Sequence, residues 1–143
     1  MAKKNEVYSL RIESYGSGGE GVAHLEGQAV FVKGALAGEL CRVQLLKVGK
    51  HAAWGRVAEV LEPSPHRQAP DCPQYPKCGG CALRHMDYQE ELRYKRQRVE
   101  DALRRIGGWE GTVDIIHGAA QPERYRNKIQ FPVAQGPQVG FYR

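Results

Sequence analysis

The chain has 143 residues, enough for one ordinary domain or two small ones, and 41% of them are hydrophobic. No run of about 18 apolar residues occurs, which excludes a membrane-spanning helix. The first residues also lack the apolar stretch of a secretory signal. We therefore expect a cytoplasmic protein that has no membrane partner.

Basic residues outnumber acidic ones, with 21 Lys and Arg against 16 Asp and Glu, for a formal net charge of +5. The excess is uneven, because residues 1–62 carry 8 basic and 7 acidic groups, whereas residues 63–143 carry 13 and 9. The net charges are therefore +1 and +4. A basic balance favours a polyanionic partner, nucleic acid first, although solubility alone explains the same charge.

Residues 6–62 are predicted to form β-structure, because short alternating apolar runs are separated by turn signals every 8–12 residues. The expected strands cover residues 7–12, 22–25, 29–32, 39–48 and 53–61. Five strands in fewer than 65 residues predict a small, partly closed barrel of the oligonucleotide-binding kind. Cys41 alternates with Val43 and Leu45, so we expect it to pack as a small apolar residue. A proline-punctuated linker, residues 62–71, follows the barrel.

Three of the four cysteines lie within ten residues, at Cys72, Cys78 and Cys81, in the spacing C-x5-C-x2-C. A tight cysteine cluster in a cytosolic chain indicates metal or redox chemistry, because disulfides are disfavoured there. Thiolates bind iron–sulfur clusters and zinc in particular. Gly79 and Gly80 let the backbone curl, so that Cys78 and Cys81 can face one metal centre.

The identity of the metal stays open at this point. A cubane iron–sulfur cluster needs four cysteine ligands, and the cluster supplies three. Zinc could instead recruit His85, which follows Cys81 in a C-x3-H spacing, or His66 upstream. Either histidine is also explained as an ordinary polar residue. Spacing alone does not separate iron–sulfur from zinc.

A helix is predicted over residues 87–106. Asp87 can act as its N-cap, with Glu90 three residues later completing a capping box, and Gly107 and Gly108 end it. Lys and Arg fill the outer face, which we expect to be mostly solvated. Apolar residues recur at helical spacing at Tyr88, Leu92, Val99, Leu103 and Ile106.

Beyond the helix the pattern returns to β, with strands expected at residues 113–116, 124–133 and 139–143. The last two would pair across a turn at residues 135–138. Because the chain ends inside a predicted strand, whose edge would be left unpaired, we expect a piece of a longer protein.

Small barrels of the predicted kind bind single-stranded RNA by stacking bases on aromatic rings and following phosphates with cations. A denser basic strand is expected in the tail, where Arg124, Arg126 and Lys128 alternate around Tyr125; a solvated edge strand is the alternative. Trp54 is explained equally well as a core residue. The candidates in the barrel are Tyr15, Lys33, Lys47, Lys50, His51 and Trp54.

Several segments, in order, resemble one family. YGSGGEGVA at residues 15–23 and VFVKGALAGE at residues 30–39 resemble a TRAM domain, a small RNA-binding barrel. The cysteine segment, residues 72–81, resembles an iron–sulfur motif, and YRNK at residues 125–128 resembles the start of an RNA-contacting central domain. Together they resemble the N-terminal part of the bacterial RNA (uracil-5-)-methyltransferases that methylate 23S rRNA.

The resemblance implies a mainly β chain with one helix. Its parts would be a five-stranded, OB-like TRAM barrel over residues 1–62, a linker and iron–sulfur cysteine loop over residues 63–86, and a helix with the truncated start of the central domain over residues 87–143. It also implies a [4Fe–4S] cluster held by Cys72, Cys78, Cys81 and a fourth cysteine outside this chain.

In the family, the S-adenosylmethionine domain, the nucleophilic cysteine and the catalytic base lie further on. The resemblance therefore implies no catalytic and no S-adenosylmethionine-binding residue in this chain, and an RNA partner, 23S rRNA. The expected function is the RNA-binding and iron–sulfur portion of an S-adenosylmethionine-dependent RNA (uracil-C5) methyltransferase. A non-enzymatic RNA-binding module with a structural zinc site is the rival prediction.

Overall fold

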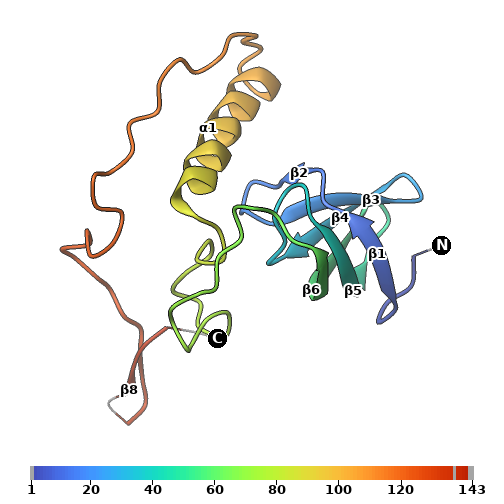
Figure 1. The fold of residues 1–143 in the computed structure, drawn as a ribbon. Coiled ribbons are helices and arrows are strands. Elements are labelled where there is room, and N and C mark those ends of the chain that lie inside the picture. Colours follow the sequence, from blue (N-terminus) through green and yellow to red (C-terminus); the bar gives the residue numbers. More distant parts are fainter. Residues whose placement is uncertain (1, 137, 142–143) are drawn as a thin grey trace. The chain divides into compact units, whose positions relative to one another are not determined.

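The computed structural model describes residues 2–136 and 138–141 and divides the chain into two compact units. The first unit holds residues 2–68 together with His85–Asp87, and the second holds Ala69–Arg84 and the chain from Tyr88 onward. Each unit is described by itself below (Figure 1).

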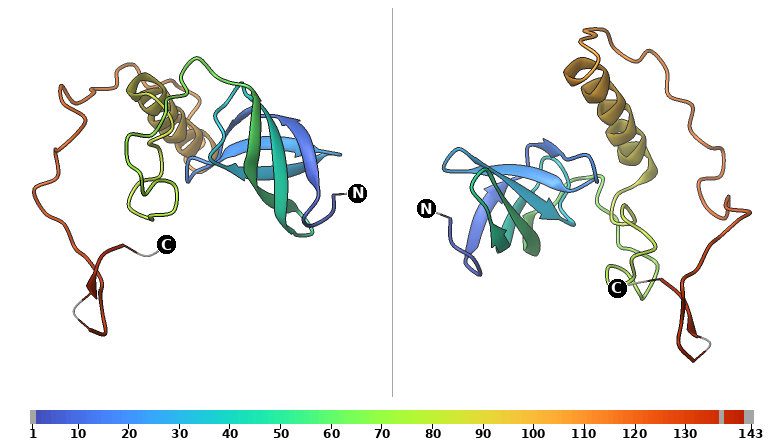
Figure 2. Two further views of the ribbon diagram at one scale, coloured as in Figure 1. Left: turned by 60° about the horizontal axis from the view of Figure 1, so that its bottom comes forward. Right: turned by 180° about the vertical axis from the view of Figure 1, so that it is seen from behind.

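The first unit is a six-stranded sheet in the order β1-β5-β6-β4-β3-β2. Neighbouring strands are antiparallel except β4 and β6, which run parallel. Since β1 also approaches β3, the sheet curls into a half-barrel (Figures 1 and 2). The strands are β1 (Val7–Arg11), β2 (Ser14–Tyr15), β3 (Gly21–Leu25), β4 (Gln28–Lys33), β5 (Leu40–Val48) and β6 (Ala52–Glu62).

The mainly β fold and the partly closed barrel are confirmed, and all five expected strands are present. The two-residue strand β2 is additional. The alternation of apolar and polar residues predicts these strands correctly because only the inner face of the curled sheet is buried, so every second side chain enters the core. The core side chains are Leu10, Ile12, Ala23, Val30, Val32, Ala35, Cys41, Val43, Leu45 and Ala53.

Cys41 packs as predicted. It is fully buried, and burial raises the pKa of its thiol to about 11. It therefore stays a neutral thiol and an apolar core residue near neutral pH.

A β-bulge interrupts the regular alternation in β5. Leu45 pairs with Gly55 and Lys47 with Trp54, which leaves Leu46 as an extra residue on β5. Leu46 and Lys47 are both exposed as a result. A bulge re-aims the side chains that follow it. Here it brings Lys47, which strict alternation would turn inward, to the outer face.

The second unit contains α1 (Tyr88–Arg105), which matches the predicted helix to within one residue at each end. Within the described residues, no helix is long and apolar enough to cross a membrane. Four of the helix's cations form ion pairs one turn away with acidic residues of the same helix. The pairs are Arg93–Glu90, Lys95–Glu91, Arg96–Glu100 and Arg104–Asp101.

The predictions of tail strands at residues 113–116 and 124–133 are wrong. The first segment is irregular, and only Val133 of the second lies in a strand. Residues 114–131 are exposed at every position. A strand needs a partner to satisfy its backbone groups and a face to bury, and the described chain offers this segment neither.

A short hairpin does form between β7 (Val133–Ala134) and β8 (Gln138–Val139). It confirms the predicted pairing of the chain on either side of this turn, but Gln138, which was predicted in the turn, lies in β8 and pairs with Ala134; Pro137 lies outside the described residues. Of the strand expected at residues 139–143, only Val139 lies in β8, and residues 142 and 143 also fall outside the described part.

Candidate nucleic-acid interface

An aromatic pair lies on the outer face of the barrel. Phe31 of β4 and Trp54 of β6 are register partners on neighbouring parallel strands. Their ring centroids are 6.1 Å apart, with 21° between the ring planes. The Nζ of Lys47 lies 5.1 Å from the centroid of the Trp54 ring, a cation–π contact. Trp54 is 41% exposed, so it is a surface residue and not part of the core.

A second row of polar side chains lies two residues further along the same strands. Lys33 and Arg56 are register partners, and two residues along a strand bring a side chain back to the same face. Arg56 donates from Nε and Nη2 to Oε1 of Gln44 at 3.2 and 3.1 Å. We call the set Phe31, Lys33, Lys47, Trp54 and Arg56 the barrel patch.

The other candidates predicted in the barrel lie outside the patch. Tyr15 pairs with Gly21, which pairs with Val32, and this row belongs to the inner face of the sheet. Lys50 and His51 are exposed in the turn between β5 and β6. Among the predicted cations of the barrel, the structure thus places Lys33 and Lys47 beside the aromatic pair.

Two patch residues were missed from the sequence, Phe31 and Arg56. A signal for Phe31 was present, because it alternates with Val30 and Val32, and these two are fully buried. A residue between two core positions of a strand points to the opposite face. The same reasoning places Arg56 two residues from Trp54, on the side facing solvent.

In the second unit, the predicted basic side chains Arg124, Arg126 and Lys128 are all exposed, on an irregular segment. The guanidinium carbon of Arg126 lies 6.0 Å from the centroid of the Tyr125 ring, and Tyr125 is itself largely exposed. Arg126 and Lys128 border an open hollow of about 460 Å³, which Ile129 and Gln130 complete. The segment therefore presents cations and an aromatic ring to solvent without forming the predicted strand.

The cysteine loop is closed by an ion pair that joins its two ends. Arg84 donates from Nε and Nη2 to the two carboxylate oxygens of Asp71, at 2.5 and 2.6 Å. This two-pronged hydrogen bonding with Arg84 lowers the pKa of Asp71. Asp71 precedes the first cysteine and Arg84 follows the last, so the ion pair holds the two ends of the cysteine loop together.

Cys72 and Cys78 are half-buried and Cys81 is exposed, and all three are unbridged thiols. The backbone N–H of Gly80 donates to Sγ of Cys78 at 3.4 Å, as the glycines in this segment allow. Soft thiol donors fit iron or zinc chemically. The described residues nevertheless contain no group of three or more His, Cys, Asp or Glu side chains close enough to hold a metal ion.

His66 and His85, the histidines that could have been zinc ligands, both lie in the first unit and contact residues of that unit. Nδ1 of His66 lies 2.9 Å from Oδ2 of Asp87. His85 is only 3% exposed, and burial, reinforced by the nearby charge of Arg67, lowers its pKa to about 4. His85 is therefore a neutral side chain near pH 7.

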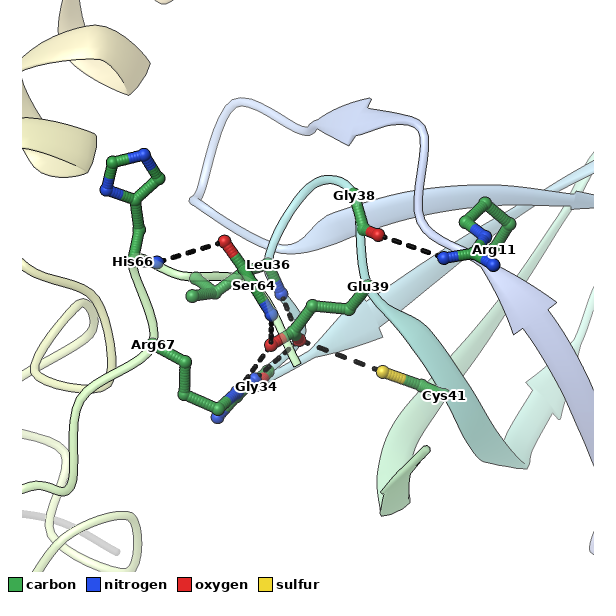
Figure 3. Close-up of polar contacts among 9 residues, drawn as sticks. All are labelled: Arg11, Gly34, Leu36, Gly38, Glu39, Cys41, Ser64, His66 and Arg67. Carbon is green, nitrogen blue, oxygen red and sulfur yellow. Dashed lines mark hydrogen bonds and ion pairs between the residues drawn. The ribbon is translucent and has the colours of Figure 1, made fainter. Parts of the chain in front are cut away.

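A buried ion pair fastens the start of the linker to the barrel (Figure 3). Arg67 donates from Nε and Nη2 to the two carboxylate oxygens of the fully buried Glu39, at 2.5 and 2.7 Å. The N–H groups of Leu36 and Ser64 donate to the same carboxylate at 2.9 and 3.1 Å. Burial alone would raise the pKa of Glu39, but these donors outweigh it and lower the pKa.

The segments on either side of the cysteine loop pair with each other next to this ion pair. Arg67 and Met86 form an antiparallel bridge, the N–H of Gln68 donates to His85 O, and the N–H of Asp87 donates to His66 O. The cysteine loop, Ala69–Arg84, therefore leaves and re-enters the barrel unit at one anchored point.

Residues 2–58 match the TRAM domain family. The chain is 43% identical over 143 residues to a Clostridium tetani protein named uncharacterized RNA methyltransferase, covering 98% of this chain and 31% of that protein. A protein of the same kind from Halalkalibacterium halodurans is 43% identical over 144 residues, covering 98% of this chain and 31% of that protein. The chain thus spans about a third of the length of the curated relatives that it matches.

Among solved structures, similarity extends to a Pyrococcus abyssi tRNA (uracil-54, C5)-methyltransferase in complex with S-adenosyl-L-homocysteine. The identity is 26% and the TM-score 0.48, over 66% of this chain and 21% of that chain. Residues 2–58 are therefore similar to the TRAM domain family, and the chain as a whole is similar to a segment that makes up about one third of the length of bacterial proteins named RNA methyltransferases.

Proposed function

We propose that this chain is the RNA-binding and iron–sulfur portion of a cytoplasmic, S-adenosylmethionine-dependent RNA (uracil-C5) methyltransferase that acts on 23S rRNA. The observation that carries the proposal is the TRAM domain at residues 2–58 within a chain whose relatives are named RNA methyltransferases. The target atom, C5 of uracil, and the substrate, 23S rRNA, are inferred from the resemblance of the motifs, in their order along the chain, to the RNA (uracil-5-)-methyltransferases. In such a reaction a cysteine adds to C6 of uracil and S-adenosylmethionine supplies the methyl group; both sites would lie outside this chain.

The metal in this proposal is a [4Fe–4S] cluster held by Cys72, Cys78, Cys81 and a fourth cysteine outside this chain. Support comes from the donor chemistry and from the way the loop is fixed. Asp71 and Arg84 close its ends, and the pairing of residues 66–68 with His85–Asp87 anchors it. The cluster's role would be structural, because methyl transfer to uracil needs no electron transfer.

Metal analysis of the full-length protein, purified without oxygen, tests this part. We expect a brown protein that contains iron and acid-labile sulfide, with the iron lost when Cys72, Cys78 or Cys81 is changed to serine. Cys41→Ala is the matched control, since Cys41 is buried in the barrel core and should not affect iron content. A colourless protein with stoichiometric zinc would contradict the proposal and favour the rival RNA-binding module with a zinc site.

RNA binding by the tail is tested with the double variant Arg126→Ala/Lys128→Ala. Each lost phosphate contact to single-stranded RNA should reduce the salt dependence of log K by about 0.7, so the pair should reduce it by about 1.4. The control is Arg93→Ala/Arg104→Ala, because these exposed cations already pair with Glu90 and Asp101. If the two double variants show the same dependence of log K on salt concentration, the tail cations do not contact RNA.

A further inference from the structure

We propose that the barrel patch is a base-stacking subsite for single-stranded RNA, in which Trp54 and Phe31 receive unpaired bases and Lys33, Lys47 and Arg56 take the adjoining phosphates. The inference rests on the proposed RNA-binding function and deepens it. It assigns the contact to particular residues of one face of the barrel and to one class of nucleic acid.

The geometry of the aromatic pair supports stacking. Phe31 and Trp54 come from the neighbouring strands β4 and β6, and their ring planes differ by only 21°. The sheet fixes both backbones, so little conformational entropy is lost when a base binds. The indole of Trp54 is 41% exposed, which leaves apolar ring surface in water. Covering that surface with a base is favourable whatever the base, because every base has a π-face.

The cations stand where phosphates would follow the bases. The aromatic row reads Phe31, Trp54, Lys47 across β4, β6 and β5, and Lys33 and Arg56 lie in the row two residues further on. Lys47 owes its place to the bulge at Leu46 and already contacts the Trp54 ring. Each stacked base would therefore have a positive charge beside it.

The charges of the patch are not compensated by carboxylates. Elsewhere on the barrel, Arg11 pairs with Glu62 and Arg42 pairs with Glu59. Arg56 is held instead by the neutral amide of Gln44, and in the described part of the chain neither Lys33 nor Lys47 forms an ion pair. Uncompensated cations beside the exposed indole of Trp54 and the half-buried ring of Phe31 favour a polyanion that has accessible bases, which is single-stranded RNA. Duplex RNA hides its base faces and does not fit the aromatic row.

Intrinsic fluorescence reports on this subsite directly. The chain has two tryptophans, Trp54 and Trp109, so Trp109→Phe leaves Trp54 as the single reporter. Titration with a short uridine-rich single strand should quench Trp54 emission, whereas the same sequence in a duplex should not. Quenching that is equal for the single strand and the duplex would overturn the assignment to single strands.

Variants of the 143-residue chain then test the energetics. Trp54→Ala should weaken binding of the single strand by about fivefold or more, and Trp54→Phe should restore most of that loss. The matched control is Leu61→Ala, because Leu61 of β6 is 41% exposed, as Trp54 is, and lies outside the patch. Lys47→Ala should reduce the salt dependence of log K by about 0.7. Arg42→Ala should leave it unchanged, because Arg42 already forms an ion pair with Glu59.

Two failures are distinguishable, provided that circular dichroism and thermal unfolding show each variant to be folded. If the chain binds single-stranded RNA but Trp54→Ala and Leu61→Ala bind equally well, the subsite is wrong and the proposed function stands. If the folded chain binds no RNA at all, the proposed function fails, and the subsite fails with it. If the patch binds a protein and the chain binds no RNA, the proposed function and the subsite likewise both fail.

Discussion

Glu39 carries a negative charge in the core of the barrel unit, where an unpaired carboxylate would be strongly destabilising. Two N–H groups from the backbone and the guanidinium of Arg67 offset this cost. Arg67 also donates to Gly34 O at 2.8 Å, so one side chain joins the linker to two points of the β4–β5 connection. The ion pair is therefore a structural anchor for the segment that leads to the cysteines.

Arg67→Met should remove about 3–5 kcal/mol from the free energy of unfolding, because it leaves the buried carboxylate with two backbone N–H donors and the weak thiol donor of Cys41. Urea unfolding measures the loss. Arg42→Met is the control, since it breaks the exposed pair with Glu59 and should cost less than about 1 kcal/mol. The double variant Glu39→Gln/Arg67→Met should recover part of the stability. Similar losses for Arg67→Met and Arg42→Met would contradict the anchoring role.

Stability should also depend on pH through His85. Its pKa is about 4 in the fold against an ordinary value of 6.5, so between these values the unfolded chain binds more protons. The free energy of unfolding should therefore fall as the pH drops from about 6.5 to 4, by up to roughly 3 kcal/mol from this residue. Glu39, whose pKa is lowered, adds a loss at more acidic pH. Thermal unfolding of His85→Gln should show a flatter profile in that window; an unchanged profile would exclude His85 as the cause.

At the scale of elements, the pairing of β5 with β6 shapes the barrel patch. Gly55 lies between Trp54 and Arg56, and a Cβ atom there would come within 2.7 Å of Cγ1 of Val43 and 2.8 Å of the Gln44 carbonyl oxygen. Glycine permits this close approach, directly beside the bulge that turns Lys47 outward. The position of the cation over the indole thus depends on a backbone contact.

Gly55→Ala should therefore destabilise the barrel by about 1–3 kcal/mol, because the added methyl group forces β5 and β6 apart. It should also shift the emission of Trp54, which lies next to it in β6. Ala58→Ser, at an exposed position of the same strand, is expected to change neither property. Chemical denaturation followed by fluorescence measures both, and wild-type values for Gly55→Ala would show that the strands can relax without cost.

At the scale of the molecule, the two units differ in how much of the chain they bury. The first has a contiguous core, whereas residues 114–131 of the second are exposed throughout. The amides of β4, β5 and β6 should therefore exchange hydrogen slowest, and those of residues 120–131 should exchange close to the rate of an unfolded peptide. Mass spectrometry of exchanged peptides tests this. Protection of residues 120–131 at the level of the barrel would reveal contacts absent from the fold described above.

The sequence predicts the barrel well because one physical rule governs it. A half-buried sheet admits apolar side chains at every second position, and Val30, Val32, Cys41, Val43 and Leu45 follow that rule. The helix is also predicted to within a residue, because the signals for its ends lie close to it in the chain: Asp87 directly precedes α1, and the glycine pair at residues 107–108 follows it within two residues. The candidate site is less predictable. Lys33, Lys47 and Trp54 were candidates, but only the strand register brings them together with Phe31 and Arg56.

The sequence by itself therefore determined the strand order along the chain, the helix, the buried Cys41 and the C-x5-C-x2-C spacing, since each depends on residues close together in the chain. The tertiary structure alone decided the rest. It selected the outer face on which aromatic rings and cations meet, turned Lys47 outward through a bulge, and anchored the linker through Glu39 and Arg67. It also left residues 124–131 without a strand. These outcomes depend on which distant segments pair, and pairing is settled by backbone hydrogen bonds and burial across the whole fold.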